Sequence, residues 1–227
     1  MLNVILLLSI SLFAPDGRLL LNPNLIPKNG EKIEDFVPQG WKIEQQIEGD
    51  LNQDSLPDAV VQLIQVQAAK DKNGGEPDTQ RALIILLKAK DGKFLRAAVA
   101  NKLLQCVGCG GMLGYGGTGA DLKIKNGVLI VSQLTGSREM VDFVNLFRFE
   151  SSVNKFYLIG EDRNMRDRGT GEGNSVSTNY LTGKQIIEVR KYNQKLDREI
   201  LVSKKTKSVA RKQQSIEDVD FEQLLLK

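Results

Sequence analysis

A short acidic loop carries the pattern of side chains best suited to chemistry in this sequence. Residues 49–58 read GDLNQDSLPD and come directly before the apolar run AVVQL. Counted from Asp50 as position 1, oxygen-bearing side chains recur at positions 1, 3, 5 and 9. This spacing lets a tight loop turn alternate side chains inward around a hard cation, with a backbone carbonyl at position 7. The predicted calcium ligands are Asp50, Asn52, Asp54, the Leu56 carbonyl and Asp58.

Two further features of the loop bear on a metal. Its three carboxylates would repel one another without a cation between them, which favours a bound ion. Pro57 stiffens the loop and gives up an N–H that a cation does not need. The alternative is an Asx-rich turn between two strands with no metal. Because all ligands come from one short segment that joins two strands, we expect a structural ion rather than a catalytic one.

The same segment has a familiar form. GDLNQDSLPDAVV resembles the calcium loop of FG-GAP and VCBS-type repeats, commonly written GDLNGDGxxD before an apolar strand. Those repeats occur in integrin-like propellers and in many secreted bacterial proteins. The resemblance covers about fifteen residues. It implies that the calcium ligands are Asp50, Asn52, Asp54 and Asp58.

The loop departs from the repeat pattern at positions that affect affinity. Gln53 and Ser55 stand where the repeats have glycine, which makes a sharp turn at little steric cost. Val61 stands at position 12, where an EF-hand supplies a bidentate glutamate. These departures predict a modest calcium affinity.

A longer likeness extends over most of residues 37–187. The layout is similar to that of a group of uncharacterised exported bacterial proteins. This likeness implies no activity. The segments that carry it are VPQGWKIEQQIEGDLNQDSLPD, RALIILL, CGGMLG, GVLIVSQLTGSRE, FRFE, FYLIGED and NYLTGK.

A glycine-rich segment, CVGCGGMLGYGGTG at 106–119, holds the only two cysteines. Cys106 and Cys109 could form a local disulfide that braces the loop, remain two reduced thiols, or act as a redox pair. The redox interpretation needs a helix N-terminus to lower a thiol pKa, and none is predicted here. The segment contains G-x-G-x-x-G, but the following ADLKIK is typical of a strand rather than a helix. We therefore predict no nucleotide site.

The absence of histidine removes several classes of enzyme. There can be no Ser-His-Asp triad, no Cys-His pair and no histidine-ligated zinc or haem. No catalytic residue is predicted. The alternative function is an exported hydrolase of glycan or peptide that uses carboxyl groups alone. Its candidate residues are Glu161, Asp162, Asp167 and Glu172, which could instead form ion pairs in a solvated loop.

Charge and termini suggest a cellular location. The net charge of +3 gives no strong case for nucleic-acid binding. The apolar run at 4–14 is too short to span a bilayer and predicts a bacterial signal peptide over 1–14. A buried strand or a misassigned start are the alternatives. The mature chain is then extracytoplasmic, periplasmic or secreted, with no membrane span. The basic segment 204–212 could contact acidic polymers or an anionic surface, or stay solvated.

Strand patterns dominate the rest of the chain. About ten short apolar or alternating runs at hairpin-like spacing predict an all-β antiparallel meander with little helix. It would form one sheet-rich domain, as a sandwich or an incomplete propeller. The strongest local signal is Asn126-Gly127, which suits a type I′ hairpin turn. The predicted organisation is an extended lead-in at 15–36, a β domain at 37–203, and a basic tail with a short terminal segment at 204–227.

These observations together predict a class of protein. We expect an exported calcium-binding β-domain with a structural ion. Its role would be binding or cell-envelope structure, with an unknown protein or glycan as ligand.

Overall fold

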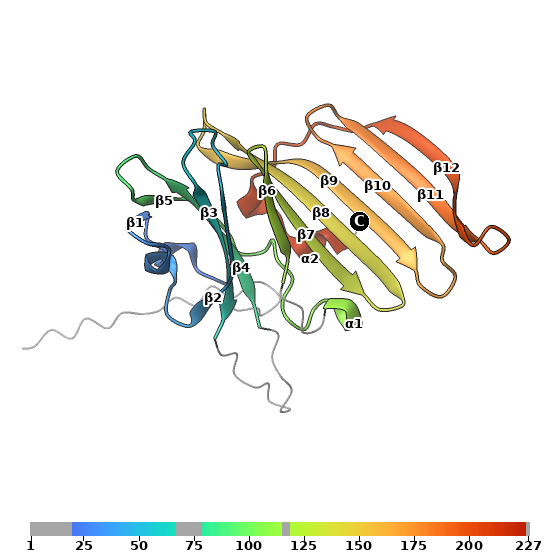
Figure 1. Ribbon diagram of the computed structural model, residues 1–227, viewed down its shortest axis with the longest axis horizontal. Coiled ribbons are helices and arrows are strands. Elements are labelled where there is room, and N and C mark those ends of the chain that lie inside the picture. Colours follow the sequence, from blue (N-terminus) through green and yellow to red (C-terminus); the bar gives the residue numbers. More distant parts are fainter. Residues whose placement is uncertain (1–19, 67–78, 115–118, 226–227) are drawn as a thin grey trace, which may run out of the picture.

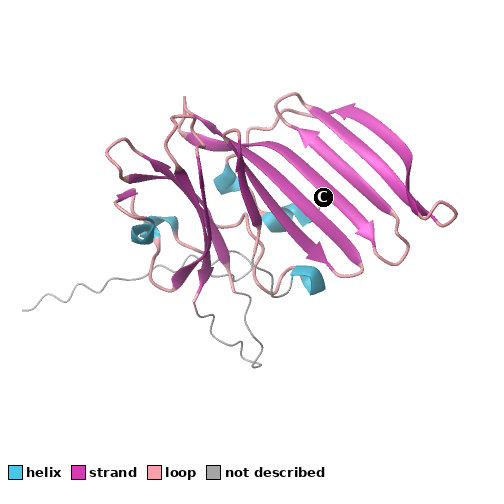
Figure 2. Ribbon diagram, in the orientation of Figure 1, coloured by secondary structure: helices cyan, strands magenta, loops and turns pink. Residues whose placement is uncertain are grey.

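The protein folds as two antiparallel β-sheets with only short helical turns beside them (Figures 1 and 2). The computed structural model describes residues 20–66, 79–114 and 119–225, so the predicted signal segment 1–14 lies outside the described residues. The prediction of an all-β antiparallel protein with little helix is confirmed, although the described residues contain twelve strands rather than about ten. Within those ranges, no helix is both long enough and apolar enough to cross a membrane.

One sheet has five strands. They are β1 (Asn29–Gly30), β2 (Trp41–Gly49), β3 (Asp58–Gln65), β4 (Arg81–Lys88) and β5 (Phe94–Ala100). Their order across the sheet is β1-β5-β4-β3-β2. Every residue of β4 except the last is buried, because both faces of this sheet are covered. One face packs on the second sheet. The lead-in covers the other face, with the 3-10 turns η1 (Pro23–Leu25) and η2 (Ile33–Phe36).

The second sheet has seven strands in consecutive order from β12 to β6. They are β6 (Asp121–Lys125), β7 (Val128–Gly136), β8 (Glu139–Glu150), β9 (Lys155–Asp167), β10 (Gly173–Asn179), β11 (Lys184–Asn193) and β12 (Arg198–Ser208). The remaining elements are α1 (Gly111–Gly114), η3 (Ile216–Asp218) and α2 (Phe221–Leu225).

The main core lies between the five-stranded sheet and the β6–β9 half of the seven-stranded sheet. Alternate residues of β3 and β4, such as Val60 and Leu83, face alternate residues of β7 and β8, such as Val131 and Phe143. The chain after β12 returns to this core, and apolar side chains of η3 and α2 belong to the same buried cluster as those of the two sheets. The Phe221 ring meets the Phe143 ring edge-on, with 5.4 Å between centroids.

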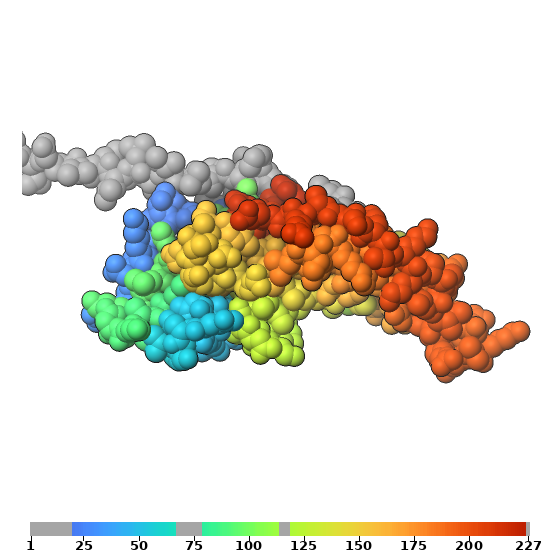
Figure 3. Space-filling model, turned by 90° about the horizontal axis from the view of Figure 1, so that it is seen from above, coloured from blue at the N-terminus to red at the C-terminus, as the bar shows by residue number. Residues whose placement is uncertain are grey.

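The other half of the seven-stranded sheet, β10–β12, extends beyond this core as a single layer (Figures 1 and 3). All residues of these three strands lie within the described ranges, and Thr178 is the only buried one. Each face of the extension is therefore in contact with solvent. The strands are joined by complete antiparallel registers, from Gly173 paired with Arg190 to Lys184 paired with Ser208.

The extension differs from what the sequence indicated. The sequence favours a solvated loop as the alternative for the carboxylates from Glu161 to Glu172, but β9 continues to Asp167 and β10 begins at Gly173. The basic tail was expected to begin at 204, but β12 runs to Ser208. A strand with solvent on both faces needs no alternation of apolar and polar residues. The usual period-two signal is therefore missing from these segments.

Candidate calcium site

The acidic loop connects β2 to β3 and is wound tightly. Gln53 and Ser55 have φ angles of 64° and 69°, in the left-handed region. A non-glycine residue in this region is destabilised by about 1–2 kcal/mol. These are the two positions at which the FG-GAP pattern has glycine. The loop therefore adopts the backbone conformation that glycine favours, although the Cβ atoms of Gln53 and Ser55 make that conformation sterically unfavourable.

Asp50 holds the first half of the loop together. Its carboxylate accepts hydrogen bonds from the backbone N–H groups of Gln53 (2.6 Å), Asp54 (3.2 Å) and Ser55 (2.9 Å). The chain is thus wrapped around this side chain. Charged acceptors make the stronger kind of hydrogen bond.

Asn52 and Asp54 bond to each other and to the loop backbone. The Asn52 Oδ1 accepts the Asp54 N–H at 3.1 Å, and the Asn52 Nδ2 donates to Asp54 Oδ2 at 2.9 Å. Asp54 Oδ1 accepts the N–H of Leu56 at 2.8 Å. Such contacts are typical of successive Asx turns.

Asp58 closes the loop at the first residue of β3. It is fully buried, and its two oxygens accept the N–H groups of Leu51 and Lys88, both at 2.8 Å. Burial raises the pKa of its carboxyl, and the negative charge of Asp54 adds to the rise, while the amide bonds oppose it. A carboxylate held in this way binds a proton more readily than one in water, and a cation would reverse that tendency.

The candidate ligand atoms are of the type that calcium prefers, but their side chains are not all grouped around one point. All candidate ligands are oxygen atoms, the ligand type of a hard cation. Within the described part of the chain, however, no three acidic, cysteine or histidine side chains are grouped so that they could hold a metal. The carboxylates instead bind the amides of their own loop. A carboxylate has about four acceptor positions, so amide bonds leave room for a metal ligand bond.

The loop lies against the other sheet. A Cβ added at Gly127 would lie 3.1 Å from the side-chain Nε2 of Gln53 and 3.6 Å from the backbone carbonyl oxygen of Leu51. Gly127 and Asn126 form the tight turn between β6 and β7, both with positive φ, which confirms the predicted hairpin. The Leu51 side chain is buried in the core shared by both sheets. The acidic loop thus sits where the two sheets meet.

The two cysteines brace the start of the glycine-rich segment. Cys106 and Cys109 are joined by a disulfide, with their Cα atoms 5.1 Å apart. The segment is also tied to the end of β7, because the Gly110 carbonyl accepts the N–H of Gly136 at 2.9 Å. Of the G-x-G-x-x-G pattern, Gly116 lies outside the described residues. The pattern leads into strand β6, not into a helix.

Two carboxylates proposed for a hydrolase lie on opposite faces. Glu161 and Asp162 are neighbours in β9, and successive residues of a strand point to opposite sides. On one face, the Glu161 carboxylate accepts the Tyr180 hydroxyl at 3.4 Å. The two groups therefore do not converge on one substrate.

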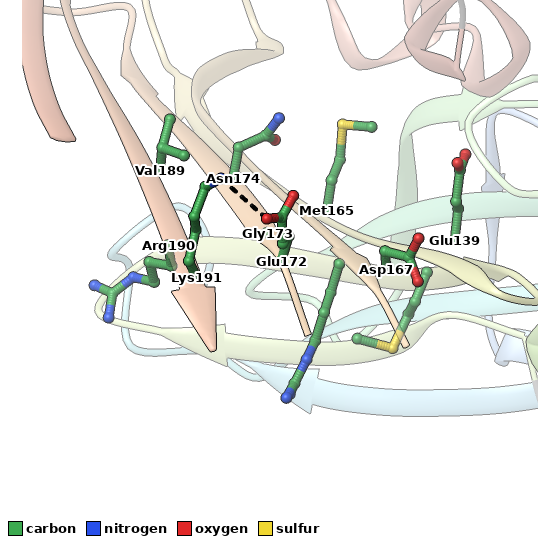
Figure 4. Close-up of a pocket in the computed structure, with 11 residues that line it drawn as sticks. Glu139, Met165, Asp167, Glu172, Gly173, Asn174, Val189, Arg190 and Lys191 are labelled. Carbon is green, nitrogen blue, oxygen red and sulfur yellow. Dashed lines mark ion pairs between the residues drawn. The ribbon is translucent and has the colours of Figure 1, made fainter. Parts of the chain in front are cut away.

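The other two, Asp167 and Glu172, line a shallow pocket of about 280 Å³ at the end of β9 (Figure 4). Asp167 pairs with Arg138 at 3.2 Å, and this contact, with two backbone amides, lowers the pKa of Asp167. Glu172 pairs with Lys191 at 3.0 Å. A general acid needs a raised pKa. Asp167 and Glu172 are therefore members of surface ion pairs. No observation in the described residues favours the hydrolase alternative.

One buried polar cluster was not predicted. Arg81 is 3% exposed and makes a two-pronged contact to Glu44, at 2.7 and 2.9 Å. The same carboxylate accepts the Gln62 amide at 2.7 Å, and Gln62 in turn accepts the N–H of Ala120. The only sequence signal was a glutamine inside the otherwise apolar run at 59–64. The cluster joins β2, β3 and β4 toward the strand ends opposite the acidic loop, and its Gln62 also bonds to Ala120, the residue before β6.

Comparison of the chain with protein-family models, with curated proteins and with solved structures found no match.

Proposed function

We propose that this protein is an exported β-domain that binds calcium at the loop between β2 and β3. The ion would have a structural role, and the domain would serve in binding or in the cell envelope, with a protein or a glycan as its ligand.

The observation that carries this proposal is the backbone of the loop. Gln53 and Ser55 are held in left-handed conformations where a calcium loop of the FG-GAP type has glycine. The oxygens of the four predicted side-chain ligands all bond to groups within or beside the same turn. An ion bound there would replace some amide contacts. It would also neutralise the buried charge of Asp58.

The position of the loop supports a structural role. It lies against the turn between β6 and β7, and Leu51 is part of the common core. Fixing the loop would therefore fix the contact between the two sheets. The local disulfide supports export, because such bonds persist in oxidising compartments.

A thermal melt tests the proposal. The protein is stripped with chelator and titrated with calcium or magnesium. At a calcium concentration of a hundred times Kd, binding adds about 2.7 kcal/mol, which raises Tm by about 5–10 °C. The rise should be lost in Asp54→Ala. The control is Asp91→Ala, because Asp91 also accepts a backbone N–H in a turn, that of Lys93 at 3.0 Å, outside the acidic loop.

Two results would count against calcium. One is an unchanged melt in the wild-type protein. The other is an equal rise with Asp54→Ala, which would place the ion elsewhere. In either case the loop would be a turn that is stabilised by its own hydrogen bonds.

The raised pKa of Asp58 gives a second test of the same site. In the metal-free protein, the folded state binds a proton at Asp58 more readily than the unfolded state. The stability contributed by this proton is therefore present at low pH and lost as pH rises through the folded-state pKa. Calcium needs the ionised form, so its binding should release protons at pH values near the raised pKa of Asp58 and none at pH values well above it. Calorimetry in buffers of different ionisation enthalpy measures this release.

A further inference from the structure

The β11–β12 hairpin and the segment after it concentrate positive charge. Residues 184–212 contain ten lysines and arginines against three acidic residues, a net charge of +7. The whole chain carries only +3, so the remainder of the protein carries −4. The hairpin forms the end of the molecule farthest from β1, in the orange part of Figure 3.

Part of this charge has no acidic partner. Lys191 pairs with Glu172, and Arg190 and Lys204 share Glu188. Within the described part of the chain, the other five cations of the hairpin make no ion pair. These five are Lys184, Lys195, Arg198, Lys205 and Lys207. Lys205 and Lys207 are two residues apart on the edge strand and so project from the same face.

Large apolar side chains are exposed at the tip of the same hairpin. Leu196 in the turn is 54% exposed, and Leu201 and Val202 in β12 are 48% and 52% exposed. Tyr192 in β11 is 40% exposed. Contiguous apolar patches on soluble domains mark sites of protein or membrane interaction. Lys195 and Arg198 flank this group at the turn, and Lys205 and Lys207 lie farther along β12, opposite Ile187 and Gln185.

We infer that the β11–β12 hairpin docks on an anionic lipid surface. The cations would meet lipid phosphates, and the tip side chains would enter the boundary between headgroups and acyl chains. Each lysine or arginine near an anionic membrane strengthens binding, and exposed apolar residues add a contribution that depends on lipid.

Other partners explain less of the hairpin. A soluble polyanion would meet the cations but would give no role to Leu196, Leu201 and Val202. A second copy of the chain would bring two strongly positive hairpins together, and lysines on an edge strand oppose strand pairing. An anionic bilayer accounts for both the charge and the apolar tip.

Vesicle flotation tests the inference with the full chain in the presence of chelator, so that calcium contributes nothing. Vesicles are made of phosphatidylcholine, alone or mixed in equal parts with phosphatidylglycerol. We expect binding to the anionic vesicles to fall about tenfold or more in Lys205→Glu/Lys207→Glu. We expect a fall of about fivefold or more in Leu196→Ser/Leu201→Ser. The apolar run at 4–14 is present in every variant, so its contribution to binding is common to all of them and cancels when variants are compared.

Matched controls alter the opposite end of the molecule. Lys90→Glu/Lys93→Glu makes the same change of charge in the turn between β4 and β5. Leu25→Ser/Leu95→Ser removes two leucines that are 61% and 49% exposed. Both control proteins should bind as the wild type does, and circular dichroism should show that all variants are folded.

Three results would overturn the inference. In the first, the controls lose as much binding as the hairpin variants. In the second, only the charge variant loses binding while the leucine variant binds normally, which indicates a soluble polyanion as partner. In the third, the wild type binds anionic vesicles no better than phosphatidylcholine vesicles. This result overturns the inference whether sedimentation shows a monomer or a dimer formed through the tip.

Discussion

The two halves of the seven-stranded sheet have the same hydrogen-bonding pattern but differ in what covers them. In β6–β9, alternate side chains such as Leu129, Phe143 and Phe147 are fully buried against the five-stranded sheet and the returning C-terminal segment. In β10–β12, solvent reaches both faces, and only Thr178 among these fully described strands is buried. The first half is therefore stabilised by apolar burial. The second depends on backbone hydrogen bonds, half-buried side chains and ion pairs.

This difference shows how one sheet can serve two purposes. Burial of apolar area is the largest favourable contribution to folding, and it is confined to one half. The other half is free to present both of its faces and its edge strand. Charge follows the same division, because the net positive charge of the chain is concentrated in β11, β12 and the segment after them.

The largest expected difference between the halves is in the response to loss of a side chain. Phe143→Ala removes a fully buried ring that contacts Phe221, and we expect it to lower the free energy of unfolding by about 4 kcal/mol. Ile187→Ala removes a half-buried side chain from β11, and we expect a loss of about 1 kcal/mol. Urea unfolding measures both. Equal losses would mean that the extension is covered in solution.

Ion pairs offer a second comparison with a smaller expected effect. Glu44→Gln removes the charge beside Arg81, whose side chain is 2% exposed, and we expect a loss of about 3 kcal/mol because the guanidinium stays buried. Glu188→Gln, in the extension, removes the partner of Arg190 and Lys204, both half-exposed. Water solvates those cations, so we expect little change in stability.

Salt sharpens this second comparison. The effect of Glu44→Gln should persist at high salt, because a buried pair is screened little. If Glu188→Gln destabilised the protein as strongly as Glu44→Gln, the ion pairs of the extension would contribute more than surface pairs normally do.

The sequence predicted the covered half well and the single-layer half poorly. The run ALIILL is apolar throughout, as suits a strand buried on both faces, and β4 is such a strand. Asn126-Gly127 indicated the hairpin between β6 and β7. By contrast, GNSVSTN has few apolar residues and contains glycine and asparagine, yet it forms β10. Its pairing with β9 and β11 holds it extended, and that pairing is set by tertiary context.

The candidate site was only partly predictable for a related reason. The spacing of Asp50, Asn52, Asp54 and Asp58 indicated a tight loop with inward-facing side chains, and in the structure these side chains accept hydrogen bonds from the backbone of their own loop. The contact of the loop with Gly127, and the amide of Lys88 on Asp58, join segments distant in sequence. The ion pair of Arg81 with Glu44 is likewise a long-range contact that no local pattern specifies.

The smallest expected effect compares two left-handed residues, one in each region. Gln53 has φ 64° in the acidic loop, and Asp197 has φ 48° in the turn between β11 and β12. Gln53→Gly should raise the free energy of unfolding by about 0.5–1 kcal/mol, because the relief of steric strain exceeds the added entropy of the unfolded chain. Asp197→Gly should give no gain. Aspartate tolerates this conformation, and Asp197 also accepts the Tyr192 hydroxyl.

Urea unfolding of the two glycine variants in chelator measures the difference. A gain for Asp197→Gly as large as that for Gln53→Gly would show that the tip of the extension is as rigidly held as the loop beside the core. The covered half and the extension would then not differ in backbone strain at these two turns. A gain in the free energy of unfolding for Gln53→Gly alone would mean that the backbone strain lies in the acidic loop, where contacts with both sheets hold the backbone in place. Calcium binding should survive this variant, since glycine is the residue that the FG-GAP pattern has at position 4 of the loop.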